Sequence, residues 1–120
     1  MDRAGVRPVV ASALCAMLLA WAVLSLSGWL FAAIVAGVIL LDCALRAAMI
    51  ANQTLVNTAV PDSRARANTI FGTHVWGGNA TGAFAASMAY AHWGWSAVCA
   101  VAALASCAAL AIHFTGAGKR

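Results

Sequence analysis

Four long apolar runs, separated by short polar segments, constrain this 120-residue chain more than any other feature. Only 8% of its residues are charged, whereas an ordinary soluble domain has about 25%. The chain therefore has too few ionisable side chains to coat a water-facing surface, and enough apolar surface to exclude intrinsic disorder. A membrane span needs about 20 apolar residues, so a chain of this length has room for several spans with short connections.

Helices are the form expected for these runs, because an open strand cannot satisfy its backbone groups in lipid. Ser27–Gly28, Pro61–Ser63 and Gly94 are the breakers expected between them. The predicted fold class is all-α: a polytopic membrane protein with four transmembrane helices in one domain over residues 1–120. The expected helices cover about residues 8–26, 29–51, 67–90 and 95–114, with a loop at about residues 58–67.

Basic residues are expected to mark one side of this helix bundle. Six of the seven fall at the two chain ends and in the central loop, and the other two turns have no Lys or Arg. Because cytoplasmic loops carry an excess of Lys and Arg, both termini and the loop at about 58–67 are predicted to be cytoplasmic. The expected location is a cell membrane, the bacterial inner membrane, crossed several times. No basic stripe runs along the chain, so a nucleic-acid partner is excluded.

The second apolar run carries two charged residues, Asp42 and Arg46. Their spacing of four residues, acid first, places them on one helix face where they can pair. Gln53 and Asn57 continue this face by the 3.6-residue period, which gives a polar stripe. Two interpretations stay open: a water-lined pathway or gate with Asp42 as a proton acceptor, or an ion pair that locks this helix to its neighbours.

The third apolar run is rich in glycine. Gly78 and Gly82 form a small-xxx-small pair, which permits close contact with another helix, and Gly77 lies beside them. These three glycines are therefore predicted to serve helix packing. His74 and Asn79 are candidate pathway residues; the alternative for both is an ordinary hydrogen bond between helices.

The remaining reactive side chains follow no pattern typical of an enzyme or a metal site. The four cysteines contain no C-x-x-C pair, and the three histidines are expected at different depths. No Ser/His/Asp or Cys/His arrangement occurs either. We therefore expect no catalytic residue, no metal and no cofactor, and the chain is not expected to be an enzyme.

The ordered series of motifs resembles a known family. The stretch DRAGVR at residues 2–7 resembles the second half of the cytoplasmic loop motif G-x-x-x-D-R-x-G-x-R of the major facilitator superfamily. The segment from Leu41 to Asn68 resembles the tenth helix and following loop of its drug-efflux-like members. Gly77 to Trp95 resembles the eleventh helix and the turn into the twelfth. The residues that match the loop motif are Asp2, Arg3, Gly5 and Arg7.

This resemblance implies the last four helices of a twelve-helix transporter, in which the loop motif steadies one conformation. The chain would then be the carboxy-terminal part of a proton-coupled efflux permease, not competent alone. Its expected partners are the lipid bilayer, other transmembrane helices and a small organic substrate. Two alternatives stay open: a small self-assembling four-helix multidrug transporter, which the absence of Glu disfavours, and a non-transporting membrane protein that binds other helices through its glycines.

Overall fold

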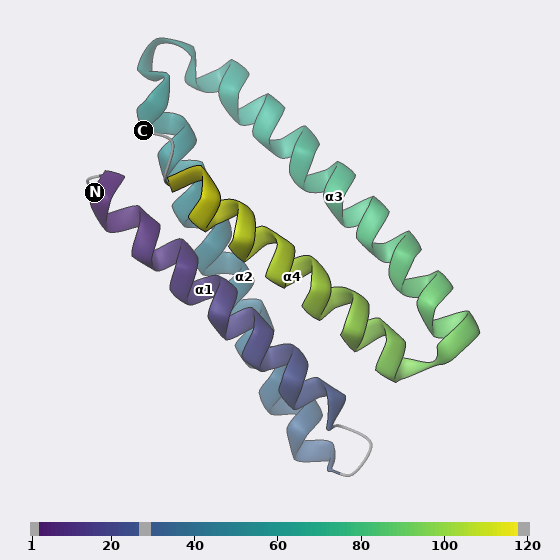
Figure 1. Cartoon of the computed structure of the whole chain (residues 1–120). Coiled ribbons are helices and arrows are strands. Elements are labelled where there is room, and N and C mark those ends of the chain that lie inside the picture. Colours follow the sequence, from purple (N-terminus) through teal and green to yellow (C-terminus); the bar gives the residue numbers. More distant parts are fainter. Residues whose placement is uncertain (1–2, 27–29, 118–120) are drawn as a thin grey trace.

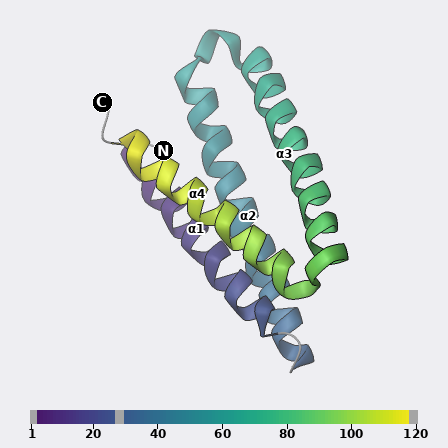
Figure 2. The ribbon, with the colours of Figure 1, turned by 45° about the vertical axis from the view of Figure 1, so that its right-hand side comes forward.

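The computed structural model describes residues 3–26 and 30–117, and these residues fold into helices joined by short turns (Figure 1). The helices are α1 (Arg3–Ser25), α2 (Phe31–Ala59), α3 (Arg64–Trp93) and α4 (Trp95–Ala117), with a short 3-10 helix, η1 (Pro61–Ser63), before α3. The expected all-α class with four long helices is confirmed for the described residues. Figure 2 shows α1 beside both α2 and α4, whereas α3 lies apart from α1 and approaches α4 and α2 near its two turns.

The contact between α1 and α2 is the best-packed part of the molecule. Val6 and Val10 of α1 pack against Ala51 of α2 in a buried cluster. Toward the other end of the pair, Leu24 contacts α2 at Gly37, where a Cβ atom would lie only 2.7 Å from Leu24 Cγ. Small residues on α2 thus let the two helices approach closely, as small residues do between membrane helices.

Both α1 and α2 extend beyond the ranges expected from hydropathy. α1 begins at Arg3 instead of about residue 8, and α2 continues to Ala59 instead of about residue 51. The two extensions support each other, because Val6 is 1% exposed and Leu55 packs beside it against the same cluster. The last two turns of α2 are rich in polar residues. They are helical because the apolar side chain of Leu55 among them packs against α1.

The loop expected at about residues 58–67 is shorter than expected. Pro61 stops α2 just before it, since proline has no N–H to donate and its ring clashes with the preceding turn. The chain reverses within η1, and α3 begins directly at Arg64. At the other turn Gly94 has φ of +78°, a conformation that side chains disfavour, and its N–H donates to the Tyr90 carbonyl at 3.0 Å. Both reversals are therefore tight.

Three of the helices are long and apolar enough to cross a membrane: α1 from Gly5, α2 over its whole length and α4 to Gly116. Four spans were expected. α3 has 30 residues but a more polar composition, and it is not among the three. The described part of the chain is therefore that of a multi-pass membrane protein with three candidate spans, and a fourth span at α3 stays a prediction.

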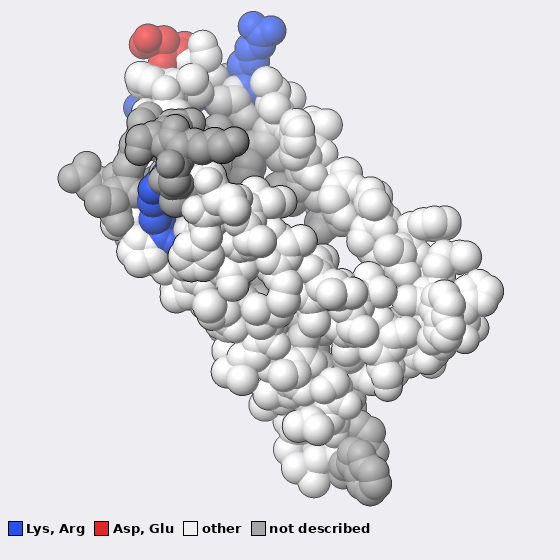
Figure 3. Space-filling view, in the orientation of Figure 1, with Lys and Arg blue, Asp and Glu red and all other residues white. Residues whose placement is uncertain are grey.

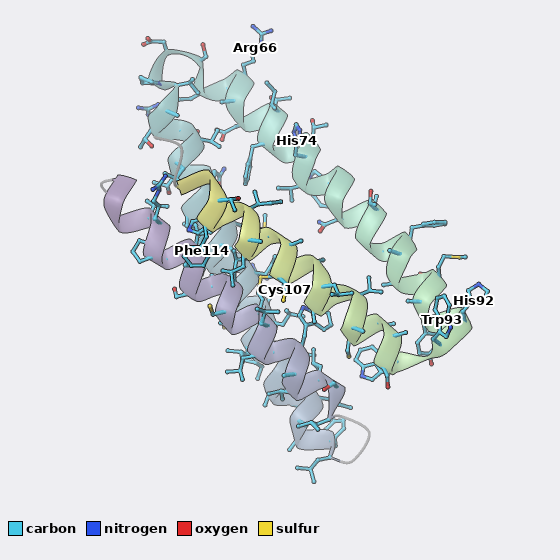
Figure 4. The ribbon with its side chains drawn as sticks, viewed as in Figure 1. Arg66, His74, His92, Trp93, Cys107 and Phe114 are labelled. Carbon is cyan, nitrogen blue, oxygen red and sulfur yellow. The ribbon has the colours of Figure 1, made fainter. Side chains whose placement is uncertain are left out.

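Charged side chains gather at one end of the face seen in Figure 3, and most of the rest of that face carries none. This is the end at which α1 begins, α4 ends and the chain turns from α2 into α3 (Figure 1). Arg66 lies there, near the start of α3 (Figure 4). The described basic segments, at the start of α1 and at the start of α3, thus share one end of the bundle, and the side of the membrane that this end faces stays a prediction.

Candidate site on the polar face of α2

The Asp42–Arg46 ion pair is the candidate site with the most defined geometry. Arg46 Nε donates a hydrogen bond to Asp42 Oδ2 at 2.7 Å, across one turn of α2. The pair is open to its surroundings, because the Arg46 side chain is 73% exposed and that of Asp42 is 55% exposed. Two charged groups within a candidate span are thus paired with each other and not covered by the rest of the described chain.

The ion pair lies on the side of α2 that faces away from α1. The residues of α2 that are buried by the packing of the bundle are Gly37, Ala44, Ala48 and Ala51. At 3.6 residues per turn they centre on the side opposite Asp42. The face of α2 with the small residues is therefore buried by the other described helices, and the charged face is left exposed.

The structure does not join the rest of the predicted polar stripe into one network. Gln53 is exposed, and Asn57 is half-buried with its Oδ1 atom covered. That oxygen has no hydrogen-bond partner among the described residues, and the same is true of Oδ1 of Asn68 on α3. Asn68 was not singled out as a site residue, because it lies at the start of the expected third helix, off the face that carries His74 and the glycines.

The glycines of α3 do not make the helix contact expected of them within the described chain. A Cβ atom added at Gly77, Gly78 or Gly82 would meet nothing within 4 Å. The reason is that α3 diverges from its neighbours, so its small residues face open space. The glycine in close contact is Gly37 instead, and its signal was present in the sequence as the small-xxx-small pair Ala33 and Gly37.

An apolar groove of about 490 Å³ separates α3 from α1 and α4. Gly78, Asn79 and Gly82 line its α3 side, and Met17 and Trp21 line its α1 side. Asn79 thus faces a groove, as a candidate pathway residue would. The remaining lining residues are small or apolar, apart from the hydroxyl of Ser106: Ala83, Ala86, Val98, Val101, Ala102, Ala105 and Ser106.

His74 lies at a different hollow. A space of about 350 Å³ between α2 and α3 is lined by Val56, Ala67, Ile70, Phe71 and His74. The Nδ1–H of His74 donates to the Ile70 carbonyl at 2.8 Å within α3. In Figure 4, His74 lies in the half of α3 near Arg66. The two candidate pathway residues of α3 therefore do not share one hollow.

The structure describes only some of the residues of the predicted loop motif. Asp2 lies outside the described residues. Arg3 begins α1, Gly5 meets open space and Arg7 is exposed. The described part of the motif is the first turns of a helix, because Val6 is buried against α2.

The described residues hold no cluster with metal-binding composition: over 3–26 and 30–117, no group of three or more His, Cys, Asp or Glu side chains could hold a metal ion. His92 and Trp93 lie at the far end of α3 from Arg66 (Figure 4), well away from His74. The ion pair on α2 is thus the best-defined polar arrangement within a candidate span of the described chain.

The chain is similar in sequence to bacterial transporters over part of their length. It is 39% identical over 102 residues to "Probable transporter SCO4007" of Streptomyces coelicolor, which is 85% of this chain and 24% of that protein. It is 28% identical over 100 residues to "Uncharacterized transporter YgaY" of Escherichia coli O157:H7, 83% of this chain and 25% of that protein. YgaY of Escherichia coli K12 matches to the same extent. No protein-family model matches the chain, and no solved structure matches it significantly.

The chain is therefore homologous to bacterial transporters and spans about a quarter of the length of the curated relatives that it matches. These relatives are transporters and not enzymes.

Proposed function

We propose that the chain is the carboxy-terminal part of a proton-coupled efflux permease of the major facilitator superfamily and that it works together with further transmembrane helices. The observation that carries this proposal is the exposed Asp42–Arg46 ion pair on a membrane-spanning helix. Charged groups in lipid are costly, and in membrane proteins they almost always face a bundle interior or a water-filled cavity. The described residues provide neither around the pair, and in this proposal other helices do so.

The match to a quarter of each transporter relative supports the same proposal, because the remaining three quarters would supply those helices. In this arrangement the polar face of α2 borders the translocation pathway or its gate. The opposite face of α2, which carries the buried alanines, packs against α1 and so holds the polar face in place. Two six-helix halves that rock about a central cavity give alternating access in such transporters.

A fourth span at α3 belongs to this proposal. Its threonine hydroxyls are satisfied within the helix, because Thr69, Thr73 and Thr81 donate to carbonyls one turn earlier at 2.9–3.0 Å. Such bonds remove the main cost of a hydroxyl in lipid. With four spans, both termini and the α2–α3 turn lie on one side, which the positive-inside rule assigns to the cytoplasm of a bacterial inner membrane. Asp2, Arg3 and Arg7 then lie where the loop motif would steady one conformation.

The test is a split-transporter experiment. The chain is co-expressed in Escherichia coli with the preceding three quarters of the Streptomyces coelicolor relative, and a lipophilic dye serves as the exported probe. We expect the two pieces to co-purify and to support dye efflux that a protonophore abolishes. Arg46→Gln should weaken efflux strongly, whereas Arg64→Gln, on the exposed start of α3, should leave it unchanged.

The outcomes separate the proposal from its alternatives. Dye uptake into proteoliposomes by the chain alone, lost with Asp42→Asn, would instead favour the self-assembling four-helix transporter. Association with another membrane complex, lost with Gly78→Leu and without any transport, would favour the interaction protein. A chain that neither co-purifies with the larger piece nor restores efflux contradicts the fragment proposal.

A further inference from the structure

The Asp42–Arg46 pair has more hydrogen-bonding capacity than it uses. A guanidinium group has five N–H donors, and an ionised carboxylate has about four acceptor sites. A single bond, from Arg46 Nε to Asp42 Oδ2, joins the two groups. Neither side chain makes another hydrogen bond to any residue in 3–26 or 30–117. The terminal Nη groups of Arg46 and the Oδ1 atom of Asp42 are therefore available to a ligand.

The bond through Nε also orients the free groups. It holds the guanidinium by its inner edge, so the two Nη groups remain as a planar fork. Such a fork matches a carboxylate, which it binds through two parallel hydrogen bonds. One turn away, Asp42 presents a free carboxylate oxygen of opposite charge, which suits an ammonium group.

Apolar side chains surround the pair on the same face of α2. Val38 and Ile39 precede it by about one turn and are 51% and 59% exposed, and Leu45 and Met49 follow the same face at 42% and 38%. Together with Asp42 and Arg46, these positions recur at intervals of three and four residues, so they form one continuous stripe. A ligand held by the ion pair would therefore rest its remaining surface on hydrocarbon.

Charge decides between ligand classes. Asp42 and Arg46 sum to zero, so a ligand with a net charge would leave one uncompensated charge in a region of low dielectric constant. A ligand with one positive and one negative end keeps the sum at zero and satisfies both free groups. A neighbouring apolar helix would satisfy neither of them.

We infer that the polar face of α2 binds a zwitterionic small molecule with an apolar side group, its carboxylate on the Arg46 Nη atoms and its ammonium on Asp42 Oδ1. This inference rests on the proposed function, since it names the substrate class of the same site. A zwitterionic lipid headgroup shares the chemistry, but Asp42 lies eleven residues into α2, about 16 Å along the helix from Phe31. That depth favours a soluble molecule in transit over a headgroup at the interface.

The experiment measures equilibrium binding of radiolabelled L-phenylalanine to the chain co-purified with the larger transporter piece, in dodecyl maltoside micelles, which contain no zwitterion. We expect saturable binding that is weakened about tenfold or more by Arg46→Gln and by Asp42→Asn, as loss of a charged hydrogen bond predicts. Arg64→Gln is the matched control and should bind as the unchanged chain does. Phenethylamine and 3-phenylpropionate, which each keep one of the two charges, should compete about tenfold less well.

Arg46→Lys guards against variants that fail to fold, because it keeps the positive charge and the pairing with Asp42 but removes the planar fork. Its helix content should match that of the unchanged chain while its affinity falls. The inference is overturned by an absence of saturable binding, by equal binding to Arg46→Gln, or by competition from 3-phenylpropionate as strong as from phenylalanine. Competition by phosphatidylethanolamine but not by phosphatidylglycerol would overturn the assignment to a soluble molecule. Successful co-purification with the larger transporter piece, without phenylalanine binding, would overturn this inference and leave the proposed function standing.

Discussion

α1 and α3 are both long helices, but their surroundings differ. α1 buries a continuous apolar stripe against its neighbours, at Val6, Val10, Ala13, Ala20 and Leu24. α3 is longer, yet Ala89 alone is buried among its residues. α1 meets α2 and α4 along its length, whereas α3 approaches the others mainly at its two turns (Figures 1 and 2). The difference teaches that other described helices of this chain bury the apolar side chains of α1, whereas most of the side chains of α3 remain exposed.

The largest effect should come from filling the close contact between α1 and α2. In Gly37→Leu, the new Cβ would lie 2.7 Å from Leu24 Cγ and 2.8 Å from Leu24 Cδ2, so the buried Leu24 side chain or the helices must shift. We expect a loss of about 2–3 kcal/mol in the free energy of unfolding, the range for overpacking. The measurement is unfolding in mixed micelles, followed by circular dichroism.

The matched change on α3 is Gly82→Leu, where a Cβ atom would meet nothing within 4 Å. Its unfolding free energy should stay the same or rise slightly, since leucine favours a helix more than glycine by roughly 1 kcal/mol or less. A destabilisation as large as that of Gly37→Leu would show that α3 packs closely within this chain, and the comparison between α1 and α3 would fail.

A smaller effect is expected from truncating the stripe of α1. Val6 is 1% exposed and packs against Ala51, so Val6→Ala should cost about 1–2 kcal/mol through lost contacts and a small cavity. Val38 on the open face of α2 is 51% exposed, and Val38→Ala is the control, with an expected cost close to zero. Equal losses in the two variants would contradict the burial of the first turns of α1.

The smallest effect concerns the link between α1 and α4. Trp95 Nε1 donates to the Leu24 carbonyl at 3.0 Å, near the ends of the two helices. Trp95→Phe removes this donor and should cost about 1 kcal/mol, the usual net value of one hydrogen bond. Trp93→Phe, at a side chain that is 75% exposed on α3, should cost less. If thermal unfolding cannot tell the two variants apart, the bond does not hold α1 to α4.

Local spacing was the most informative part of the sequence. The residues of the Asp42–Arg46 pair are one helical turn apart, and the pairing follows from that spacing alone. The end of α2 was harder to predict, because the apolar run stops at about residue 51, although the 3.6-residue period continues the polar face through Gln53 and Asn57. They are helical because Leu55, between them, packs with Val6 from the other end of the chain. Such a contact across about fifty residues has no local signature.

The glycines show the same limit from the opposite side. Gly78 and Gly82 have the spacing of a packing motif, yet they face open space in the described chain, while Gly37 carries the close contact. A small-xxx-small pair indicates that another helix can come close at that position. It does not indicate that such a helix is present in the same chain. Which of the two sites is filled depends on the direction in which each turn sends the next helix.

The sequence by itself determined that this is a helical membrane protein with tight reversals at Pro61 and Gly94, because apolar runs and backbone breakers act over a few residues. It also determined the ion pair on α2. Only the tertiary structure decided that this pair lies on the face opposite α1, that α3 diverges, and that an apolar groove opens beside it. The physical reason is that hydropathy and helical spacing set what each face can contact, whereas the packing of distant helices decides what it does contact.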